Sequence, residues 1–424
     1  MSGWKIAQLD EIADVTIGRQ RSPKYADGPQ MAPYVRAQNV TDGRLDLDSV
    51  LTMNFDQSER RRYRLEFGDV LVTEGCGSPN LLGASCIWRG EIEGFVGFQN
   101  HVLRVRHRPG ESDPFFLYGL CRWLHHSGRW QETGGGTSIL NIGLGRAKNV
   151  AVPAPTFGEQ TAIGFVLRAM DDLIENNRRR VELLEQMAQA IYREWFVHFR
   201  YPGHEHDELV DSPLGPIPSG WEVGSIGDAA SYVNRGVAPK YDERATSIVV
   251  NQKCVRNGRL GLVQARTQSK AVPADKVIRF GDVLVNSTGV GTLGRVAQLY
   301  WDQQNATVDT HVTIVRPHRT TNLDWFGLTM LSLQPEFEAQ GVGSTGQTEL
   351  SRTAIAGQPM VLPPTEVQQR FGTKVHALRQ MEIELSSAAD RLAAIRDLLL
   401  PKLVTGQIDV SKLDLDAVLE GAGV

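Results

Sequence analysis

The sequence predicts an α/β protein built from two similar mixed α/β domains, separated by two long helices that pair as an antiparallel coiled coil, with pseudo-twofold internal symmetry. Two observations lead to this prediction. The hexapeptide Phe-Gly-Asp-Val-Leu-Val starts at Phe67 and recurs unchanged at Phe280. A segment of helical periodicity follows each α/β part. A repeat of about 210 residues is too long for a solenoid unit, so the chain is expected to contain two duplicated halves.

Shorter matches support the duplication and define its parts. They pair Trp4 with Trp221, Pro23-Lys24-Tyr25 with Pro239-Lys240-Tyr241, His101-Val102 with His311-Val312, and Pro155-Thr156 with Pro364-Thr365. Between them lie glycine-rich sequence and short β-type runs at 69–73, 102–106, 283–286 and 312–315. We therefore expect α/β domains over 1–155 and 221–363.

Each half ends in a predicted long helix, over 156–200 and over 364–405. A capping box opens each helix, formed by Thr156 with Glu159 and by Thr365 with Gln368. Pro401 is expected to stop the second helix. A helix of 35 to 40 residues would be roughly 50 to 60 Å long, which suits a spacer.

Residues spaced alternately by four and three mark a heptad seam on each helix. The seam contains Met170, Ile174, Asn177, Val181, Leu184 and Ile191 in the first helix and Leu378, Leu385, Leu392 and Leu399 in the second. The other seam positions of the second helix are filled by Phe371, Lys374, Met381, Ala388 and Ile395. Two matched seams favour pairing with each other, although each helix could instead fold back on its own domain. Asn177 would either fix the register of the pair or be satisfied within its own helix.

Two remaining segments are predicted to lie outside the domains and helices. Residues 406–424 form a tail. The segment 201–220 is rich in proline and acidic residues, contains no lysine or arginine, and is interpreted as an exposed linker. His204 and His206 lie in this linker without further ligands nearby, so no metal site is expected.

Composition limits the classes of function. The chain has 424 residues, 41% of them hydrophobic, which is enough to bury two or three cores. A formal net charge of -4 excludes a binder that relies on bulk positive charge, so any nucleic-acid contact must be local. The four cysteines form no Cys-x-x-Cys pair, which favours the reducing cytoplasm. No apolar run approaches the roughly 18 to 20 residues of a membrane-spanning helix, so no membrane partner is expected.

Motifs of catalysis are missing. The sequence contains no phosphate loop, no His-Glu-x-x-His and no Gly-x-Ser-x-Gly elbow. A Gly-x-Gly-x-x-Gly does occur at Gly289, Gly291 and Gly294, but the residues after it alternate like a strand. We interpret these glycines as a tight turn between strands and predict recognition rather than catalysis.

Basic side chains gather in the two α/β domains, whose net charges are +1 over 1–155 and +2 over 221–363. Such clusters can contact phosphates, and arginine can also pair with guanine. The candidate basic residues are Arg19, Arg21, Lys24, Arg60, Arg61, Arg104 and Arg106 in the first domain and Arg235, Lys240, Lys253, Arg256 and Arg259 in the second. Loop residues able to read base edges are Ser138, Asn141, Gln347 and Thr348. A solvated charged surface, or an ordinary loop, is the alternative for each.

The order of these features resembles the specificity subunit of type I restriction-modification enzymes. The marks are the pairs Glu159-Gln160 and Gln368-Gln369 at the two helix starts, the segment 215–221 (Gly-Pro-Ile-Pro-Ser-Gly-Trp) before the second domain, the repeated hexapeptide, and Leu399-Leu400-Pro401-Lys402-Leu403 near the end. They span nearly the whole chain.

The resemblance implies a function. Each α/β domain would be a target recognition domain that reads one half of a bipartite site in double-stranded DNA, and the two helices would fix the distance between the halves. Two modification subunits would dock on the helices and methylate adenine, and restriction subunits would join for cleavage. The chain itself would be non-catalytic and would hold no cofactor, with S-adenosylmethionine and ATP expected only on the partner subunits.

Two other functions remain open from the residues. One is a coiled-coil adaptor that bridges proteins without touching DNA. The other is an enzyme that binds a nucleotide at the Gly289 loop. Salt-dependent retention on duplex DNA would separate a DNA-binding subunit from the adaptor, and stabilisation by nucleotides would identify the enzyme.

Overall fold

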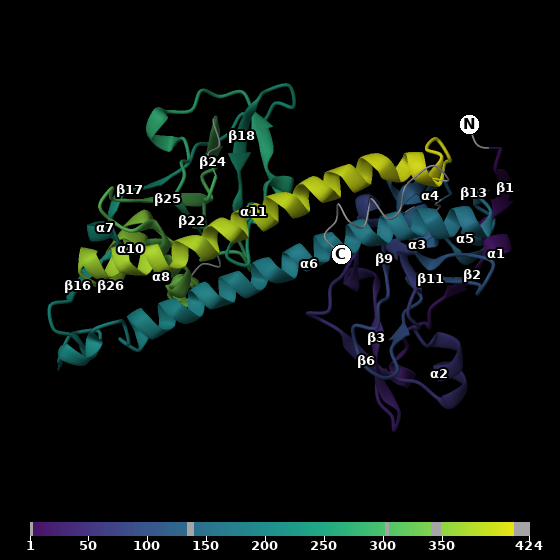
Figure 1. The fold of residues 1–424 in the computed structure, drawn as a ribbon, viewed down its shortest axis with the longest axis horizontal. Helices are drawn as coiled ribbons and strands as arrows, with labels where there is room; N and C mark the ends of the chain where they lie inside the picture. The colour runs from purple at the N-terminus through teal and green to yellow at the C-terminus, as the bar shows by residue number, and fades with distance from the viewer. Residues whose placement is uncertain (1–2, 134–139, 302–304, 341–348, 411–424) are drawn as a thin grey trace. The chain divides into compact units, whose positions relative to one another are not determined.

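The computed structural model describes residues 3–133, 140–301, 305–340 and 349–410, which divide into two compact units. Unit 1 comprises residues 1–178 and 387–424, and unit 2 comprises residues 179–386. Each unit therefore contains one α/β region together with a part of each long helix, α6 (Phe157–Tyr192) and α11 (Thr365–Val404) (Figure 1).

The core of unit 1 is a four-stranded antiparallel sheet. Its strand order is β2 (Ala13–Ile17), β11 (Val102–His107), β7 (Val70–Thr73) and β9 (Ser85–Ile87). Every residue of β7 is buried, because this strand lies between β11 and β9 and carries apolar side chains on both faces. The predicted strands at 69–73 and 102–106 thus form the centre of the sheet.

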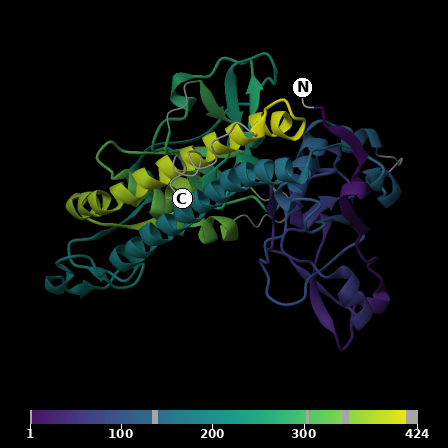
Figure 2. The same ribbon diagram turned by 45° about the vertical axis from the view of Figure 1, so that its right-hand side comes forward.

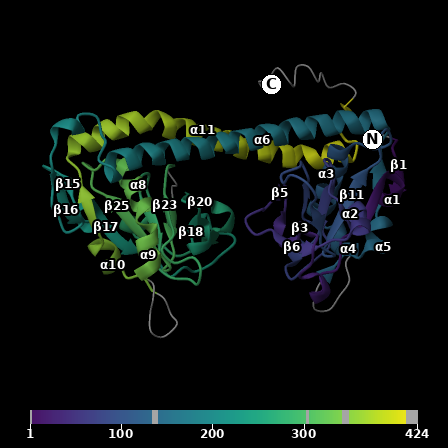
Figure 3. The ribbon, with the colours of Figure 1, turned by 90° about the horizontal axis from the view of Figure 1, so that it is seen from below.

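A second sheet of unit 1 lies farther from the long helices than the first (Figures 1 and 3). It contains β10 (Gly97–Phe98), β3 (Met31–Val35) and β6 (Leu51–Asn54), with β10 parallel to β3 and β6 antiparallel to it. The other elements of the unit are β1 (Lys5–Gln8), α1 (Leu9–Ile12), β4 (Val40–Thr41), β5 (Arg44–Leu45), α2 (Gln57–Tyr63), β8 (Gly75–Cys76), α3 (Pro114–His126), α4 (Arg129–Thr133), β12 (Leu140–Asn141), α5 (Leu144–Lys148) and β13 (Ala151–Ala154).

Unit 2 repeats the strand order of unit 1. Its four-stranded sheet runs β17 (Ala230–Arg235), β25 (Val312–Pro317), β22 (Val283–Asn286) and β23 (Val296–Gln298), and its three-stranded sheet runs β21 (Arg266–Gln268), β18 (Ser247–Val250) and β24 (Ala306–Val308). The β18–β24 pair is parallel, as is β3–β10 in unit 1. The other elements are β14 (Leu209–Val210), β15 (Ile217–Pro218), β16 (Glu222–Ser225), α7 (Ile226–Ala229), β19 (Val255–Arg256), β20 (Arg259–Leu260), α8 (Leu323–Ser332), α9 (Gln334–Gln340), α10 (Arg352–Gly357) and β26 (Pro359–Leu362).

In unit 1 the two long helices run side by side (Figure 2). Both pack on α3. Leu167 of α6 and the buried Leu400 and Val404 of α11 share one apolar core with α3. Gly119 of α3 makes this contact possible, because a Cβ there would lie 2.4 Å from Leu167 Cδ1. Arg396 of α11 also donates to Asp171 of α6 at 2.6 Å.

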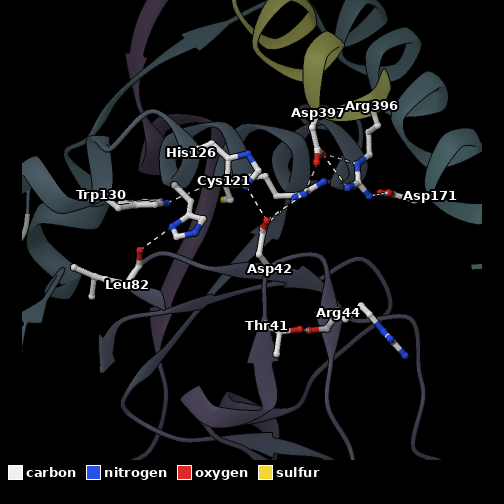
Figure 4. A network of polar contacts seen from close by, with 12 residues as sticks. Thr41, Asp42, Arg44, Leu82, Cys121, His126, Trp130, Asp171, Arg396 and Asp397 are labelled. Carbon is white, nitrogen blue, oxygen red and sulfur yellow. Dashed lines mark hydrogen bonds and ion pairs between the residues drawn. The ribbon is translucent and has the colours of Figure 1, made fainter. Parts of the chain in front are cut away.

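A polar network links α3 to the end of α11 in unit 1 (Figure 4). Arg122 Nε donates to Asp42 Oδ1 at 3.1 Å, and Arg122 Nη2 donates to Asp397 at 3.3 Å. His126 Nε2 lies 2.7 Å from Asp42 Oδ2. Burial opposes ionisation of Asp42, but hydrogen bonds from His126 and Arg122 hold the pKa of its carboxyl well below its usual range.

In unit 2 the long helices pack through aromatic side chains. Phe371 of α11 is fully buried, and its ring centroid lies 5.0 Å from that of Phe196, 5.7 Å from Trp195 and 6.3 Å from Tyr192. These aromatic residues come from the last turns of α6 and from the π-helical turn Arg193–Val197 that continues it. They bury large apolar areas, so they are the main packing contact between the two helices in this unit.

The helix starts confirm one predicted capping box and correct the other. Thr156 and Glu159 form the box, with Thr156 N donating to Glu159 Oε2 at 2.8 Å. Gln368 instead donates to Pro363 O at 2.9 Å and accepts from Asn322 N. Gln160 makes the same two contacts in unit 1, to Pro155 O and from Asp113 N. The counterpart of Gln368 is therefore Gln160 and not Glu159.

The predicted seam matches burial on α6 better than on α11. Ile174, Val181 and Leu184 are buried, while Met170, Asn177 and Ile191 are partly buried. On α11 the leucines at 378, 385, 392 and 399 are all partly buried.

Two predictions about α11 are wrong. Met381 and Ile395 are 43% and 48% exposed, whereas Arg379 and Arg396 are each 8% exposed. These arginines turn inward because Glu382 and Asp171 supply carboxylate partners. Pro401 lies inside α11, which continues to Val404 because Leu403 and Val404 are buried in the core of unit 1.

The segment 201–220 is more ordered than an exposed linker. It contains the hairpin of β14 and β15, and Tyr201 and Ile217 are each 4% exposed. Tyr201 stacks on Trp221 with ring centroids 5.2 Å apart. In the part of the chain that the structure describes, no helix is long and apolar enough to cross a membrane. Over the same residues, no group of three or more His, Cys, Asp or Glu side chains is placed to hold a metal ion.

Candidate nucleic-acid interface

The side chain of Arg19 links the loop after β2 to α2 and to the end of β6 in unit 1. It is 4% exposed, its guanidinium carbon lies 3.5 Å from the ring centroid of Tyr25, and Nη2 pairs with Glu59 Oε1 at 2.7 Å. Nη1 also donates to the carbonyl of Asn54. The preceding Gly18 lets the backbones cross, because a Cβ there would lie 2.2 Å from Gln99 O. Arg19 therefore positions Tyr25, while Arg21 and Lys24 beside it are exposed.

Arg60 of α2 packs on a small aromatic core. Phe55 and Phe95 contact each other with centroids 5.0 Å apart, and Arg60 lies 4.8 Å from the Phe95 centroid. Arg60 also donates to Phe55 O and Gln30 O, which fixes its position. Arg61 is exposed on the same helix. Of this pair, Arg61 is thus the one whose charge faces solvent.

The structure gives Arg104 and Arg106 roles within the fold. The predicted alternation on β11 is present, but Arg104 is 7% exposed and donates to the carbonyls of Arg62 and Arg64. Burial and the neighbouring Arg106 lower the pKa of Arg104. Arg106 forms a bidentate pair with the buried Asp69 at 2.7 Å. Their donors are therefore largely occupied by protein acceptors.

Unit 2 assembles a basic and aromatic cluster at the corresponding place. Arg266 lies over the ring of Tyr241 at 3.5 Å, and Tyr241 is 44% exposed. Tyr241 forms a β-bridge with Gln268, which brings Lys240 and Lys270 to the same edge. Tyr25 and Tyr241, from the repeated Pro-Lys-Tyr, thus each stack on an arginine, although the arginines come from different elements.

The remaining basic candidates of unit 2 differ in their contacts. Lys240, Lys253 and Arg256 are exposed. Arg259 forms a bidentate pair with Glu185 of α6 at 2.6 Å. Arg235 pairs with Glu349 at 2.6 Å and donates to Leu350 O. The hairpin of β19 and β20 sets Arg256 opposite Arg259. Both arginines are exposed, and Arg259 also anchors the hairpin to α6.

Three of the four loop candidates, Ser138, Gln347 and Thr348, lie outside the described residues. Asn141 is partly buried and accepts from Arg146 Nη2 at 3.1 Å. The Gly289 loop joins β22 to the antiparallel β23, and its three glycines have φ between 71° and 114°. No helix begins at this loop, so it is the turn predicted from its sequence and not a dinucleotide fingerprint.

The sequence locates most of the charged residues but not the groups that they contact. Nothing in a single sequence links Phe55 and Phe95 to Arg19 and Arg60. Chemically, each unit offers exposed lysine and arginine for phosphate oxygens and a stacked arginine–tyrosine pair for flat groups.

Two known proteins and one solved structure are similar to this chain over nearly its whole length. No family model matches the chain. The chain is 26% identical over 418 residues to the type I restriction enzyme MjaIX specificity subunit of Methanocaldococcus jannaschii, which covers 97% of this chain and 94% of that protein. It is 20% identical to the putative type I restriction enzyme MjaX specificity subunit of the same organism, over 96% of this chain and 94% of that protein.

A solved structure has a similar fold. The S subunit of a type I restriction-modification system from M. genitalium aligns with a TM-score of 0.56 and 17% sequence identity, over 95% of this chain and 96% of that one. The predicted resemblance to type I specificity subunits is therefore confirmed over nearly the whole chain.

Proposed function

We propose that this chain is the DNA specificity subunit of a type I restriction-modification complex, which reads a bipartite target and directs adenine methylation and restriction by its partners. One observation carries the proposal: the similarity to the MjaIX specificity subunit extends over 97% of this chain and 94% of that protein. A shared module alone would leave large parts unmatched. The chain would select the site and contribute no catalytic residue.

The proposed recognition domains are 1–155 and 221–363. Their support is that both units contain the same four-stranded and three-stranded sheets in the same strand order. Two copies of one scaffold with different surface loops suit two half-sites of different sequence, because a scaffold positions loops without fixing their chemistry. The pseudo-twofold relation between the copies belongs to the same proposal.

Phosphate contact would come from the basic residues that face solvent. These are Arg21, Lys24 and Arg61 in unit 1 and Lys240, Lys253 and Arg256 in unit 2. Arg19, Arg60 and Arg259 would act by holding the surface in place, since their guanidinium groups have protein partners. Base reading would involve the loops of Ser138, Asn141, Gln347 and Thr348.

The long helices would act as an antiparallel coiled-coil spacer. Helices α6 and α11 have 36 and 40 residues, or about 54 and 60 Å of rise. Support comes from within each unit, where the helices contact each other through Arg396 and Asp171 in unit 1 and through Phe371 and Tyr192 in unit 2.

The helices would also bind the modification subunits. Large apolar side chains are exposed in pairs one turn apart on each helix: Leu183 and Met187 on α6 at 58% and 52%, and Ile395 and Leu398 on α11 at 48% and 64%. Clustered exposed apolar residues are typical of protein interfaces. S-adenosylmethionine and ATP would be bound by the partner subunits.

Methylation mapping tests the proposal. A host that carries the modification subunit is compared with and without this chain, and we expect sequence-specific adenine methylation at a two-part site only when the chain is present. Methylation or cleavage by the purified chain alone would contradict the proposal. A purified complex that assembles but shows no salt-dependent retention on duplex DNA would instead favour the protein adaptor.

A further inference from the structure

Packing or backbone conformation explains the residue at five of the six positions of the repeated hexapeptide. Gly68 and Gly281 adopt φ of +90° and +87°, which favours glycine. Asp69 and Asp282 are 1% exposed and pair with Arg106 and Arg316. The three residues after each aspartate are buried in β7 and β22. The residue at the first position is the one whose side chain is neither buried nor required by the backbone conformation.

The phenylalanine at this first position is exposed in both units. Phe67 is 54% exposed and Phe280 is 44% exposed. The exposed part of each ring gains no free energy from burial in the folded chain. The presence of phenylalanine at equivalent places of two otherwise divergent domains therefore points to contact with another molecule.

Each of these rings lies beside a long helix. Phe67 contacts Phe115 at 6.3 Å between centroids, and Arg168 of α6 lies over Phe115 at 4.9 Å. Phe280 contacts Tyr300 at 6.3 Å. Arg379 of α11 lies over Tyr300 at 4.1 Å. One intervening ring thus links each phenylalanine to a long helix.

The surroundings of the two rings differ in charge. Glu66 precedes Phe67, whereas Arg279 precedes Phe280. Phe280 borders a hollow of about 720 Å3 that is also lined by Arg279, His318 and Arg319. The apolar ring is therefore the shared feature, and the charges around it are not.

We propose that Phe67 and Phe280 are two equivalent docking points, each of which inserts into an apolar pocket on one copy of the same partner chain, the modification subunit. This inference rests on the proposed function. The reason is that half-sites of different sequence require different reading surfaces, whereas two copies of one partner require the same surface twice. Phe67 would serve the copy on unit 1, and Phe280 the copy on unit 2.

Protein fits this surface better than DNA does. The sugar-phosphate backbone is also the same at both half-sites, but it is anionic and is bound by hydrogen-bond donors, which a phenylalanine ring lacks. A buried aromatic anchor is typical of protein interfaces, where one residue of this kind often carries much of the affinity.

The test measures how many copies of the modification subunit bind. Native mass spectrometry and titration are carried out on the full chain and its Phe67→Ala, Phe280→Ala and doubly substituted variants. We expect each single variant to weaken one copy about tenfold or more while the other binds normally, and the double variant to weaken both. Phe67→Leu and Phe280→Leu should retain most of the affinity.

Matched controls are Leu81→Ala in unit 1 and Val263→Ala in unit 2, which are 46% and 94% exposed and lie outside the repeated element. Full binding of two copies by the double variant would overturn the inference, as would equal weakening by the controls. Unchanged subunit binding with loss of DNA retention would also overturn it, in favour of DNA contact. A wild-type chain that binds no modification subunit would refute the proposed function itself, before any variant is compared.

Discussion

Arg106 and Asp69 form a two-pronged ion pair in unit 1, with Nε and Nη2 of the arginine each 2.7 Å from one carboxylate oxygen. Arg316 and Asp282 repeat the pair in unit 2 with the same atoms and distances. Each carboxylate also accepts a backbone N–H from three residues earlier in the chain. The aspartate thereby ties the turn before the central strand to the neighbouring strand in both units.

Replacing Asp69 should destabilise unit 1. Asp69→Ala removes the bidentate partner of the Arg106 guanidinium, which keeps only Glu66 and the carbonyl of Arg64, and it frees the N–H of Glu66. We therefore expect a loss of about 2 kcal/mol of unfolding free energy. Urea unfolding followed by tryptophan fluorescence measures it. The control is Asp14→Ala. The ion pair between Asp14 and Arg108 is exposed, so this substitution should lower the unfolding free energy by less than about 1 kcal/mol. Equal effects of the two changes would contradict the structural role of Asp69.

The repeat allowed much of the fold to be predicted. The identical hexapeptide located the strand after Phe67 and the one after Phe280, and the heptad spacing located both long helices, because backbone periodicity is a local property. The faces of α11 were less predictable. Met381 and Ile395 match the heptad pattern, yet Arg379 and Arg396 turn inward, since their carboxylate partners lie on other turns and other elements.

The candidate site was predicted less well for a related reason. Basic residues that cluster in the sequence indicate a charged region, but the sequence does not show which groups these residues contact. Arg104 and Arg106 alternate along one strand, which the sequence predicts. Only the fold reveals the carbonyls and the carboxylate that accept their hydrogen bonds. Arg21 and Lys253 have the same local signal and are exposed.

Removing exposed basic residues should lower the salt dependence of DNA binding. Arg21→Ala and Lys253→Ala would each remove one phosphate contact, so the slope of log affinity against log salt should fall by about 1 for each. Binding of the assembled complex to duplex DNA at several salt concentrations measures the slope. Arg370→Ala, which removes an exposed charge from α11, is the control and should leave it unchanged. Unaltered slopes for both variants would exclude these two side chains from the interface.

Removing the ring of Phe371 should destabilise unit 2 strongly. This side chain is fully buried among Tyr192, Trp195 and Phe196. Phe371→Ala leaves a cavity between the helices, with an expected cost of about 3 to 5 kcal/mol. Urea unfolding read by tryptophan fluorescence is suitable, because Trp195 is a direct neighbour. Met381→Ala, on the exposed side of the same helix, should cost less than about 1 kcal/mol, and a comparable loss there would argue against this packing.

The carboxyl of Glu382 should make unit 2 less stable as pH rises. Burial raises its pKa to about 7, and repulsion from Glu185 adds to this effect. Attraction to Arg379 and Arg259 opposes it. The folded state therefore binds this proton more tightly than the unfolded state, so the contribution is present below the ordinary glutamate pKa and is lost as pH rises through about 7.

Glu382→Gln should remove that dependence. We expect the variant to match the wild type near pH 5 and to exceed it in unfolding free energy near pH 8, measured by urea unfolding across this range. Glu384→Gln changes an exposed carboxylate on the same helix and should show a constant difference from the wild type. A difference between wild type and Glu382→Gln that stays flat with pH would be evidence against the raised pKa.

Lengthening both helices should change the spacing of the recognised half-sites. A heptad inserted after Arg178 in α6 and another after Ser386 in α11 preserves the seven-residue pattern and adds about 10 Å of rise, or about three base pairs of duplex. Methylation mapping should then reveal the same half-sites with a gap longer by that amount. Seven residues inserted instead into 201–220 should leave the gap unchanged, because that segment lies outside both helices. If the doubly extended chain kept the original gap, the helices would not determine the distance between the half-sites, whatever their pairing.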